Sequence, residues 1–223
     1  MGRRAGSHNA DFEATRVGLL IRVGARLLAP DGAGASLREL ATAAGVGVTT
    51  LKHYFPDRDA LIAAYLKHCH DQGREYLLLV ATHPLQADAA ASLRWTLDLI
   101  RIGLEHGPLL QMHALGLRAG LDSPQLGPAY LSTLLEPTLA CVEVRIERHQ
   151  ARGELQGHSP RLLALQLVSP LLLALLHQRG LCGAQLRPLD PAALVDALIA
   201  ALPPAAAPSP CSPAADTTGR ASP

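Results

Sequence analysis

The chain is rich in leucine and alanine, and this bias most narrows the folds open to it. It has 43 leucines and 37 alanines among 223 residues, against only nine valines and six isoleucines. Leucine and alanine lose little conformational freedom in a helix, whereas strands favour the β-branched side chains that are scarce here. We therefore expect an all-α fold and exclude a β-sandwich or a parallel α/β sheet.

Charge and cysteine content exclude further classes of protein. Eighteen arginines and two lysines stand against 19 acidic residues, so the formal net charge is +1 and a polybasic, histone-like binder is excluded. The four cysteines form no CxxC pair and no apolar run follows the polar start of the chain, which predicts a cytoplasmic protein with reduced thiols. The most apolar stretch, 162–176, is short of the roughly 20 residues that a membrane span needs. We interpret it as a buried helix and expect no membrane partner.

Helical patterns separated by short breaks run along most of the chain. Ser36 and Glu39 have the spacing of a capping box, and Asp57 suits the N-cap of the helix that follows it. Six prolines in 203–223 predict a disordered tail, and we expect 1–10 to be a flexible arm. The expected helices cover 12–29, 37–44, 48–55, 58–80, 85–105, 108–119, 128–152, 160–181 and 191–202.

Small and apolar residues between 36 and 55 have the spacing of a helix-turn-helix. Ala41 is small enough for a second helix to cross over it, and Gly45 can supply the positive φ of the turn. Val46 and Leu51 would fill the angle between the two helices. An ordinary αα-corner uses the same residue types, so this spacing alone leaves both alternatives open.

The residues around this motif closely resemble a known DNA-binding domain. Residues 36–61 read SLRELATAAGVGVTTLKHYFPDRDAL, and 17–65 as a whole is similar, in order and spacing, to the DNA-binding domain of the TetR family of transcriptional repressors. The remainder of the chain matches only in general plan. The resemblance implies a three-helix N-terminal helix-turn-helix domain (11–57), a connecting helix (58–82) and a C-terminal antiparallel helical bundle for ligand binding and dimerisation (83–202).

The same resemblance implies a function. Family members are homodimers that bind a palindromic operator in double-stranded DNA and are released when a small-molecule effector binds the second domain. Carried onto this sequence, the recognition helix is 48–54, where apolar contacts to thymine methyls and polar contacts to bases and phosphates are expected. The implied DNA-binding residues are Arg38, Val48, Thr49, Thr50, Lys52, His53, Tyr54 and Arg58.

Three positions depart from the family pattern. Gly47 stands where Ser or Thr usually caps the recognition helix, at a cost of only a few tenths of a kcal/mol. Lys52 stands where tyrosine is common, and Arg58 replaces the usual lysine while keeping its charge. The first two changes leave the operator sequence open, and none of the three opposes DNA binding.

The expected second domain contains candidates for an effector pocket and a dimer interface. For the pocket we expect Trp95, Leu99, Met112 and His113, and a plain core role is the alternative for such residues. Pro137 is expected to bend the helix over 128–152. Apolar stripes on this helix and on 160–181 predict a four-helix interface between two copies. The expected interface residues are Leu135, Leu139, Val142, Leu165, Leu172 and Leu176.

The other polar clusters predict no catalytic or metal site, and we expect no cofactor. His68, Cys69 and His70 are adjacent on a helix, where neighbouring side chains point about 100° apart and cannot converge on one ion. The sequence has no GxSxG, Walker A or HExxH motif. The alternative to a DNA-binding regulator is an all-helical ligand-binding protein or enzyme that does not bind DNA. We expect a repressor, and an activator is the alternative that the sequence leaves open.

Overall fold

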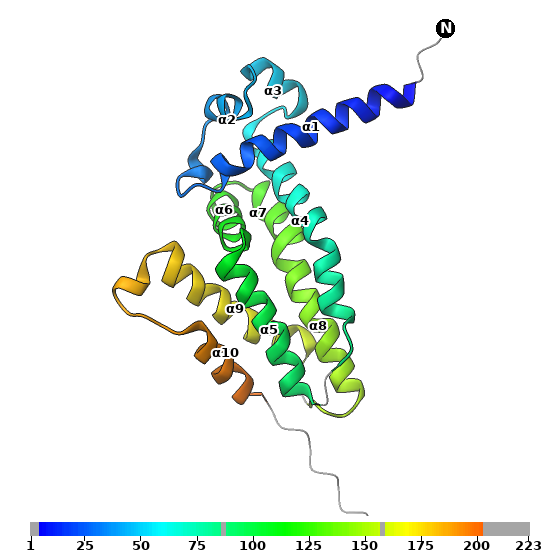
Figure 1. The fold of residues 1–223 in the computed structure, drawn as a ribbon, viewed down its shortest axis with the longest axis vertical. Coiled ribbons are helices and arrows are strands. Elements are labelled where there is room, and N and C mark those ends of the chain that lie inside the picture. The colour runs from blue at the N-terminus through cyan, green and yellow to red at the C-terminus, as the bar shows by residue number, and fades with distance from the viewer. Residues whose placement is uncertain (1–4, 86–87, 157–158, 203–223) are drawn as a thin grey trace, which may run out of the picture.

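A computed structural model describes residues 5–85, 88–156 and 159–202, and all regular structure within them is helical, as expected (Figure 1). The helices α1, α2 and α3 lie at one end of the molecule, and the remaining helices form a bundle below them. The α-helices are α1 (Ala5–Leu27), α2 (Leu37–Ala44), α3 (Val48–Tyr54), α4 (Arg58–Thr82), α5 (Ala89–His106), α6 (Leu109–Asp122), α7 (Leu126–Tyr130), α8 (Glu136–Ala151), α9 (Pro160–Leu175) and α10 (Pro191–Ala200). Short turns of other helix types are η1 (Gly32–Gly34), η2 (Leu131–Leu135), η3 (Leu176–Gly180) and η4 (Gly183–Gln185).

The long helix α4 joins the two ends of the molecule. It starts beside α2 and α3 and runs down the bundle along α8 (Figure 1). Asp57 caps its start, because the side-chain oxygen accepts a hydrogen bond from the Ala60 amide at 2.8 Å. The predicted connecting helix is therefore present, and it extends to Thr82.

The N-terminal helix is longer than the sequence pattern predicted. α1 begins at Ala5, so the expectation of a flexible arm is wrong for residues 5–10. Ala5, Ala10 and Ala14 favour a helix without contributing an apolar stripe, and apolar periodicity alone started the helix at Phe12. Residues 1–4 and the expected disordered tail, 203–223, lie outside the described residues.

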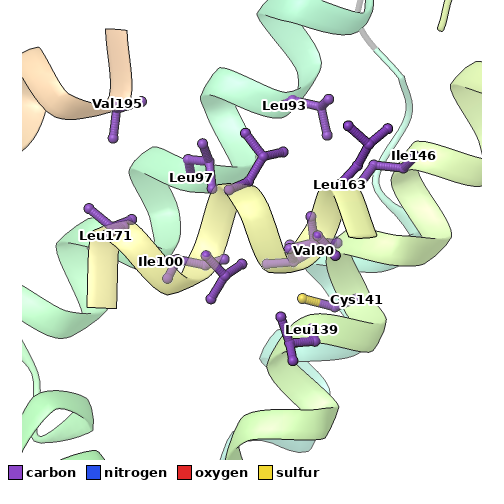
Figure 2. Close-up of a cluster of buried hydrophobic side chains, with 14 of the residues drawn as sticks. Val80, Leu93, Leu97, Ile100, Leu139, Cys141, Ile146, Leu163, Leu171 and Val195 are labelled. Atoms are coloured by element: carbon purple, nitrogen blue, oxygen red, sulfur yellow. The ribbon is translucent and has the colours of Figure 1, made fainter. Parts of the chain in front are cut away.

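The far end of the bundle contains a large hydrophobic core. Figure 2 shows side chains from α4, α5, α8, α9 and α10 meeting there, among them Val80, Leu97, Ile146, Leu163 and Val195. The segment Pro160–Gly180 is long and apolar enough to cross a membrane by length and composition. However, the inner face of α9 is buried against α5, α8 and α10, as a core helix of the bundle.

Burial corrects part of the predicted dimer interface. Leu139 and Val142 have no exposed surface and Leu172 is only 8% exposed, so these three belong to the core of a single chain. The prediction that they face a partner is wrong, because an apolar stripe marks a buried face without saying what buries it. Leu135, Leu165 and Leu176 are half-buried. The outward side chains of α8 and α9 include Val144, Leu162 and Leu173, which are 39%, 54% and 66% exposed.

Pro137 acts on the helix ahead of it. The α7–α8 segment is continuous, but its turn over Leu131–Leu135 is a π-turn in which the Glu136 amide donates to the Leu131 carbonyl. A proline ring clashes with the carbonyl four residues earlier and its nitrogen donates no hydrogen bond. The wider turn accommodates both effects.

Candidate nucleic-acid interface

The first helix of the motif, α2, is capped as predicted. The Ser36 Oγ accepts from the Glu39 amide at 3.2 Å, and the Ser36 amide donates to Glu39 Oε2 at 2.7 Å. These two bonds, together with Arg26, lower the pKa of the Glu39 carboxyl to about 2. Arg26 also pairs with Asp31, so the end of α1 is fixed to the start of α2.

The turn between α2 and α3 has helix-turn-helix geometry. Gly45 has φ 67° and ψ 32°, the left-handed backbone conformation that residues other than glycine adopt only at a cost in free energy. Ala41 and Leu51 are buried under the crossing, and Phe55 closes the end of α3. The predicted helix-turn-helix is confirmed, and it presents the outer face of α3 to solvent.

The predicted recognition helix, α3, exposes most of the residues predicted to contact DNA. Thr49, Thr50, Lys52 and His53 are exposed, while Val48 and Tyr54 are half-buried. Gly47 occupies the N-cap position without a side-chain bond, as its lack of a side chain dictates.

An aromatic contact that the sequence did not predict holds α3 against α1. The Phe12 ring stacks on Tyr54 with ring centroids 4.7 Å apart, and it meets the edge of His53 at 5.7 Å. Stacked aromatic pairs add about 0.5–1.5 kcal/mol beyond their buried area. Phe12 therefore orients two predicted DNA-contacting side chains, and the N-terminal half of α1 extends beyond α4 in Figure 1.

Arg58 makes contacts within the protein. Its Nε donates to the Ala35 carbonyl at 2.9 Å, and its Nη1 pairs with Asp59 at 3.1 Å. Asp59 also accepts from the Ser123 hydroxyl at 2.7 Å, which links the start of α4 to the loop before α7. Arg58 therefore holds the start of α4 against the turn that precedes α2.

Most cations of the helix-turn-helix domain have partners inside the protein. Arg22 donates to the Ala44 carbonyl at 2.7 Å, and Arg16 lies over the Phe55 ring at 5.3 Å. Within residues 5–66, the side chains of Arg38 and Lys52 are the cationic ones that make no ion pair or hydrogen bond. Both are exposed, Arg38 in the first turn of α2 and Lys52 on α3. These two charges are available to an anionic partner.

The four residues predicted to line an effector pocket lie in different parts of the molecule. Trp95 stacks on His83 at 4.5 Å and covers Arg145, and Leu99 packs on the core of the far end. Met112 lines a shallow groove of about 460 Å³ between α1, α4 and α6.

His113, the fourth predicted pocket residue, is buried at the end of the bundle nearer the helix-turn-helix. Its Nδ1 lies 2.9 Å from the Tyr130 hydroxyl, and burial lowers its pKa to about 4. The ring is therefore neutral at physiological pH and fits the alternative of a core histidine with a satisfied hydrogen bond.

Metal-binding groups are scattered. Across the described parts of the chain, no three or more His, Cys, Asp or Glu side chains converge. Cys69 shares a hydrogen bond with Tyr65, and burial raises the pKa of its thiol.

Comparisons with known proteins identify the N-terminal domain by sequence and show similar folds for most of the chain. The family model for bacterial regulatory proteins of the tetR family matches residues 20–65. A TetR-family transcriptional regulator from Mesorhizobium loti has a similar structure, with 21% identity, 85% of this chain and 93% of that chain covered, and a TM-score of 0.63. GusR of Salmonella enterica is similar at 19% identity, covering 83% and 93%, with a TM-score of 0.61. A TetR-family transcriptional regulator from a Rhodococcus species is similar at 18% identity, with 85% of this chain and 98% of that chain covered and a TM-score of 0.62. A comparison with curated proteins finds no match.

Proposed function

The chain carries the DNA-binding domain of the TetR family of bacterial regulatory proteins, and from this premise we propose that it is a ligand-responsive repressor. It binds a palindromic operator as a homodimer, in the cytoplasm, and a small-molecule effector releases it. The observation that carries this proposal is the exposed outer face of α3, together with Arg38 and Lys52, whose side chains make no ion pair or hydrogen bond within the described residues. Neutralising phosphates with such side chains supplies much of the affinity of a protein for DNA.

The division of roles follows from the exposure of each side chain, which separates residues that contact bases from residues that position the protein on the DNA backbone. Thr49 and Thr50 are exposed in the first turns of α3, where a recognition helix reads base edges in the major groove. Lys52 reaches a phosphate from α3, and Arg38 reaches the DNA backbone from the start of α2. Val48 and Tyr54 are half-buried, so each offers one edge to DNA while the rest of the side chain packs inside.

We assign the dimer face to the outward sides of α8 and α9. Val144, Leu162 and Leu173 leave apolar surface exposed there, which a second copy related by a two-fold axis would cover. Arg161 flanks this face and pairs with Glu136 and Glu143 at 2.8 and 2.9 Å. The two α3 helices of such a dimer would be held at a fixed separation, as a palindromic operator requires.

A binding assay on the promoter beside the chain's own gene tests this function. We expect a saturable shift whose affinity falls with salt, and Lys52→Ala and Arg38→Ala should each weaken it. In a dimer each change removes two phosphate contacts, so the slope of log affinity against log salt should flatten by about 2.

Lys67→Ala is the matched control, because Lys67 is exposed on α4 and pairs with Asp71 at 2.6 Å away from the α3 face. It should bind as the parent does. A parent chain that shifts no promoter DNA would favour the alternative, an all-helical ligand-binding protein. Unchanged binding by both variants would show that α3 is not the DNA-binding face.

A further inference from the structure

A pocket of about 310 Å³ lies between the helix-turn-helix domain and the bundle. One wall comes from the end of α1 and the turn after it, with Leu27, Pro30 and Ala33. The opposite wall comes from α5 and α6, and the segment after α9 closes one side. In Figure 1 the end of α1 lies directly above α6. The volume is at the lower end of the range for small-molecule sites, so it suits a small ligand.

The pocket is apolar in its depth and cationic at its mouth. Leu27, Leu104, Leu110 and Leu115 line it and are buried, whereas Arg118 and Arg179 line it and are exposed. No acidic side chain is among its lining residues in the described chain.

The two arginines donate to backbone carbonyls and to no carboxylate. Arg118 Nη1 donates to the Pro30 carbonyl, and Arg179 Nη1 donates to the Glu105 carbonyl. Within the described residues neither guanidinium forms an ion pair. Two uncompensated positive charges beside an apolar cavity are complementary to a ligand with one anionic end and an apolar body. Arginine also matches the planar geometry of a carboxylate, which it can bind through two N–H groups.

We propose that this pocket binds a small apolar carboxylate, with its acid group between Arg118 and Arg179 and its body against the buried leucines. The inference rests on the proposed function, because it assigns the chemical class of the effector. It differs from the pocket expected from the sequence, since Trp95, Leu99, Met112 and His113 are not among its lining residues.

This position couples ligand binding to DNA binding. The Arg118–Pro30 bond joins α6 of the bundle to the turn that follows α1 of the DNA-binding domain. A carboxylate that binds Arg118 competes with the Pro30 carbonyl for the N–H groups of the Arg118 guanidinium. The bound ligand would then shift the helix-turn-helix relative to the bundle, because its apolar body contacts both.

Isothermal titration calorimetry on the full chain, without DNA, tests the site directly. The probes are octanoate, 1-octanol as its neutral counterpart, and inorganic phosphate as an anion without an apolar body. We expect octanoate to bind at least tenfold more tightly than either control. Arg118→Gln and Arg179→Gln should each weaken octanoate binding about tenfold, which corresponds to the loss of about 1.4 kcal/mol. Arg74→Gln, an exposed arginine on α4 outside the pocket, should have no effect.

A second variant separates loss of the site from loss of the fold. Ala114→Phe fills the pocket from α6 and leaves both arginines in place, so it should abolish octanoate binding while the chain melts cooperatively. Equal binding of octanoate and 1-octanol, or parental octanoate binding by both arginine variants, would overturn the proposal. If octanoate binds through the arginines but the promoter is not bound, the site stands and the proposed function fails. If the promoter is bound but octanoate is not, the proposed function stands and the proposed site fails.

Discussion

Arg145 is the best test of how the bundle holds the end of α4. Its guanidinium is fully buried and donates to the carbonyls of Val80 and His83 at 3.0 and 3.1 Å and to the Ser92 hydroxyl at 2.6 Å. The Val80 carbonyl would pair with the amide four residues later in a helix, but that residue is Pro84, which has none. Arg145 therefore supplies the donor that proline withholds. Burial lowers the pKa of Arg145, yet the side chain retains its charge.

The cost of Arg145→Met follows from the acceptors it leaves unpaired. Arg148 also donates to the His83 carbonyl, at 3.0 Å, so that oxygen keeps a partner. The Val80 carbonyl and the Ser92 hydroxyl lose theirs, at about 1–3 kcal/mol each for buried polar groups. Methionine fills much of the vacated volume, which limits any cavity term. We expect Arg145→Met to lower the free energy of unfolding by about 2–6 kcal/mol.

Urea denaturation at fixed protein concentration measures this change, with Arg148→Met as the control. Arg148 is half-buried and its loss deprives only the Ala81 carbonyl of a donor, so we expect about 1 kcal/mol. The double variant should cost more than the sum, since His83 then loses both donors. Refutation would be an Arg145→Met protein at least as stable as Arg148→Met, or strict additivity of the two.

Three further predictions concern the cap, the core and the dimer. The low pKa of Glu39 gives stability that is complete above about pH 4.5 and lost as pH falls towards about 2, so thermal melting of Glu39→Gln should depend less on acid than that of the parent. Gly116→Ala would place a methyl 2.2 Å from the Tyr130 ring and should cost about 1–3 kcal/mol in urea, whereas Gly103→Ala, whose added carbon meets Leu109 at 3.6 Å, should not destabilise. Leu173→Glu should convert a dimer to monomers in sedimentation velocity, and Leu186→Glu, 86% exposed outside α9, should not; a dimeric Leu173→Glu would count against the assigned face.

The helix-turn-helix could be predicted because its determinants are close in sequence. The capping box spans Ser36 to Glu39, and Gly45 fixes the turn nine residues after Ser36, so each signal acts through local backbone geometry. The all-α class followed equally directly from composition. Predicting these features does not require knowing which helices pack against one another.

The pocket and the dimer face depend on distant contacts, which periodicity does not report. Arg118 meets Pro30 across 88 residues, and Arg145 meets Val80 across 65. The apolar stripe containing Leu139 and Val142 correctly predicted a buried face, but this face packs on the core of the same chain and not on a second copy. Phe12 was missed as a partner of Tyr54 because the pattern treated it only as the first residue of a helix.

The apolar side chains around the helix-turn-helix also limit how this protein can be recombined with others. Leu40, Leu51 and Phe55 belong to one hydrophobic cluster with Leu115 of α6 and Tyr130 of α7. A chimaeric regulator that joins residues 5–57 to another bundle would expose the part of this cluster that α6 and α7 cover. A graft that keeps its DNA-binding head folded must carry α6 and α7 with it, or redesign the apolar surface they leave. It is therefore simpler to change the DNA sequence that this protein recognises by substituting exposed residues of α3, because these residues contribute little to that cluster.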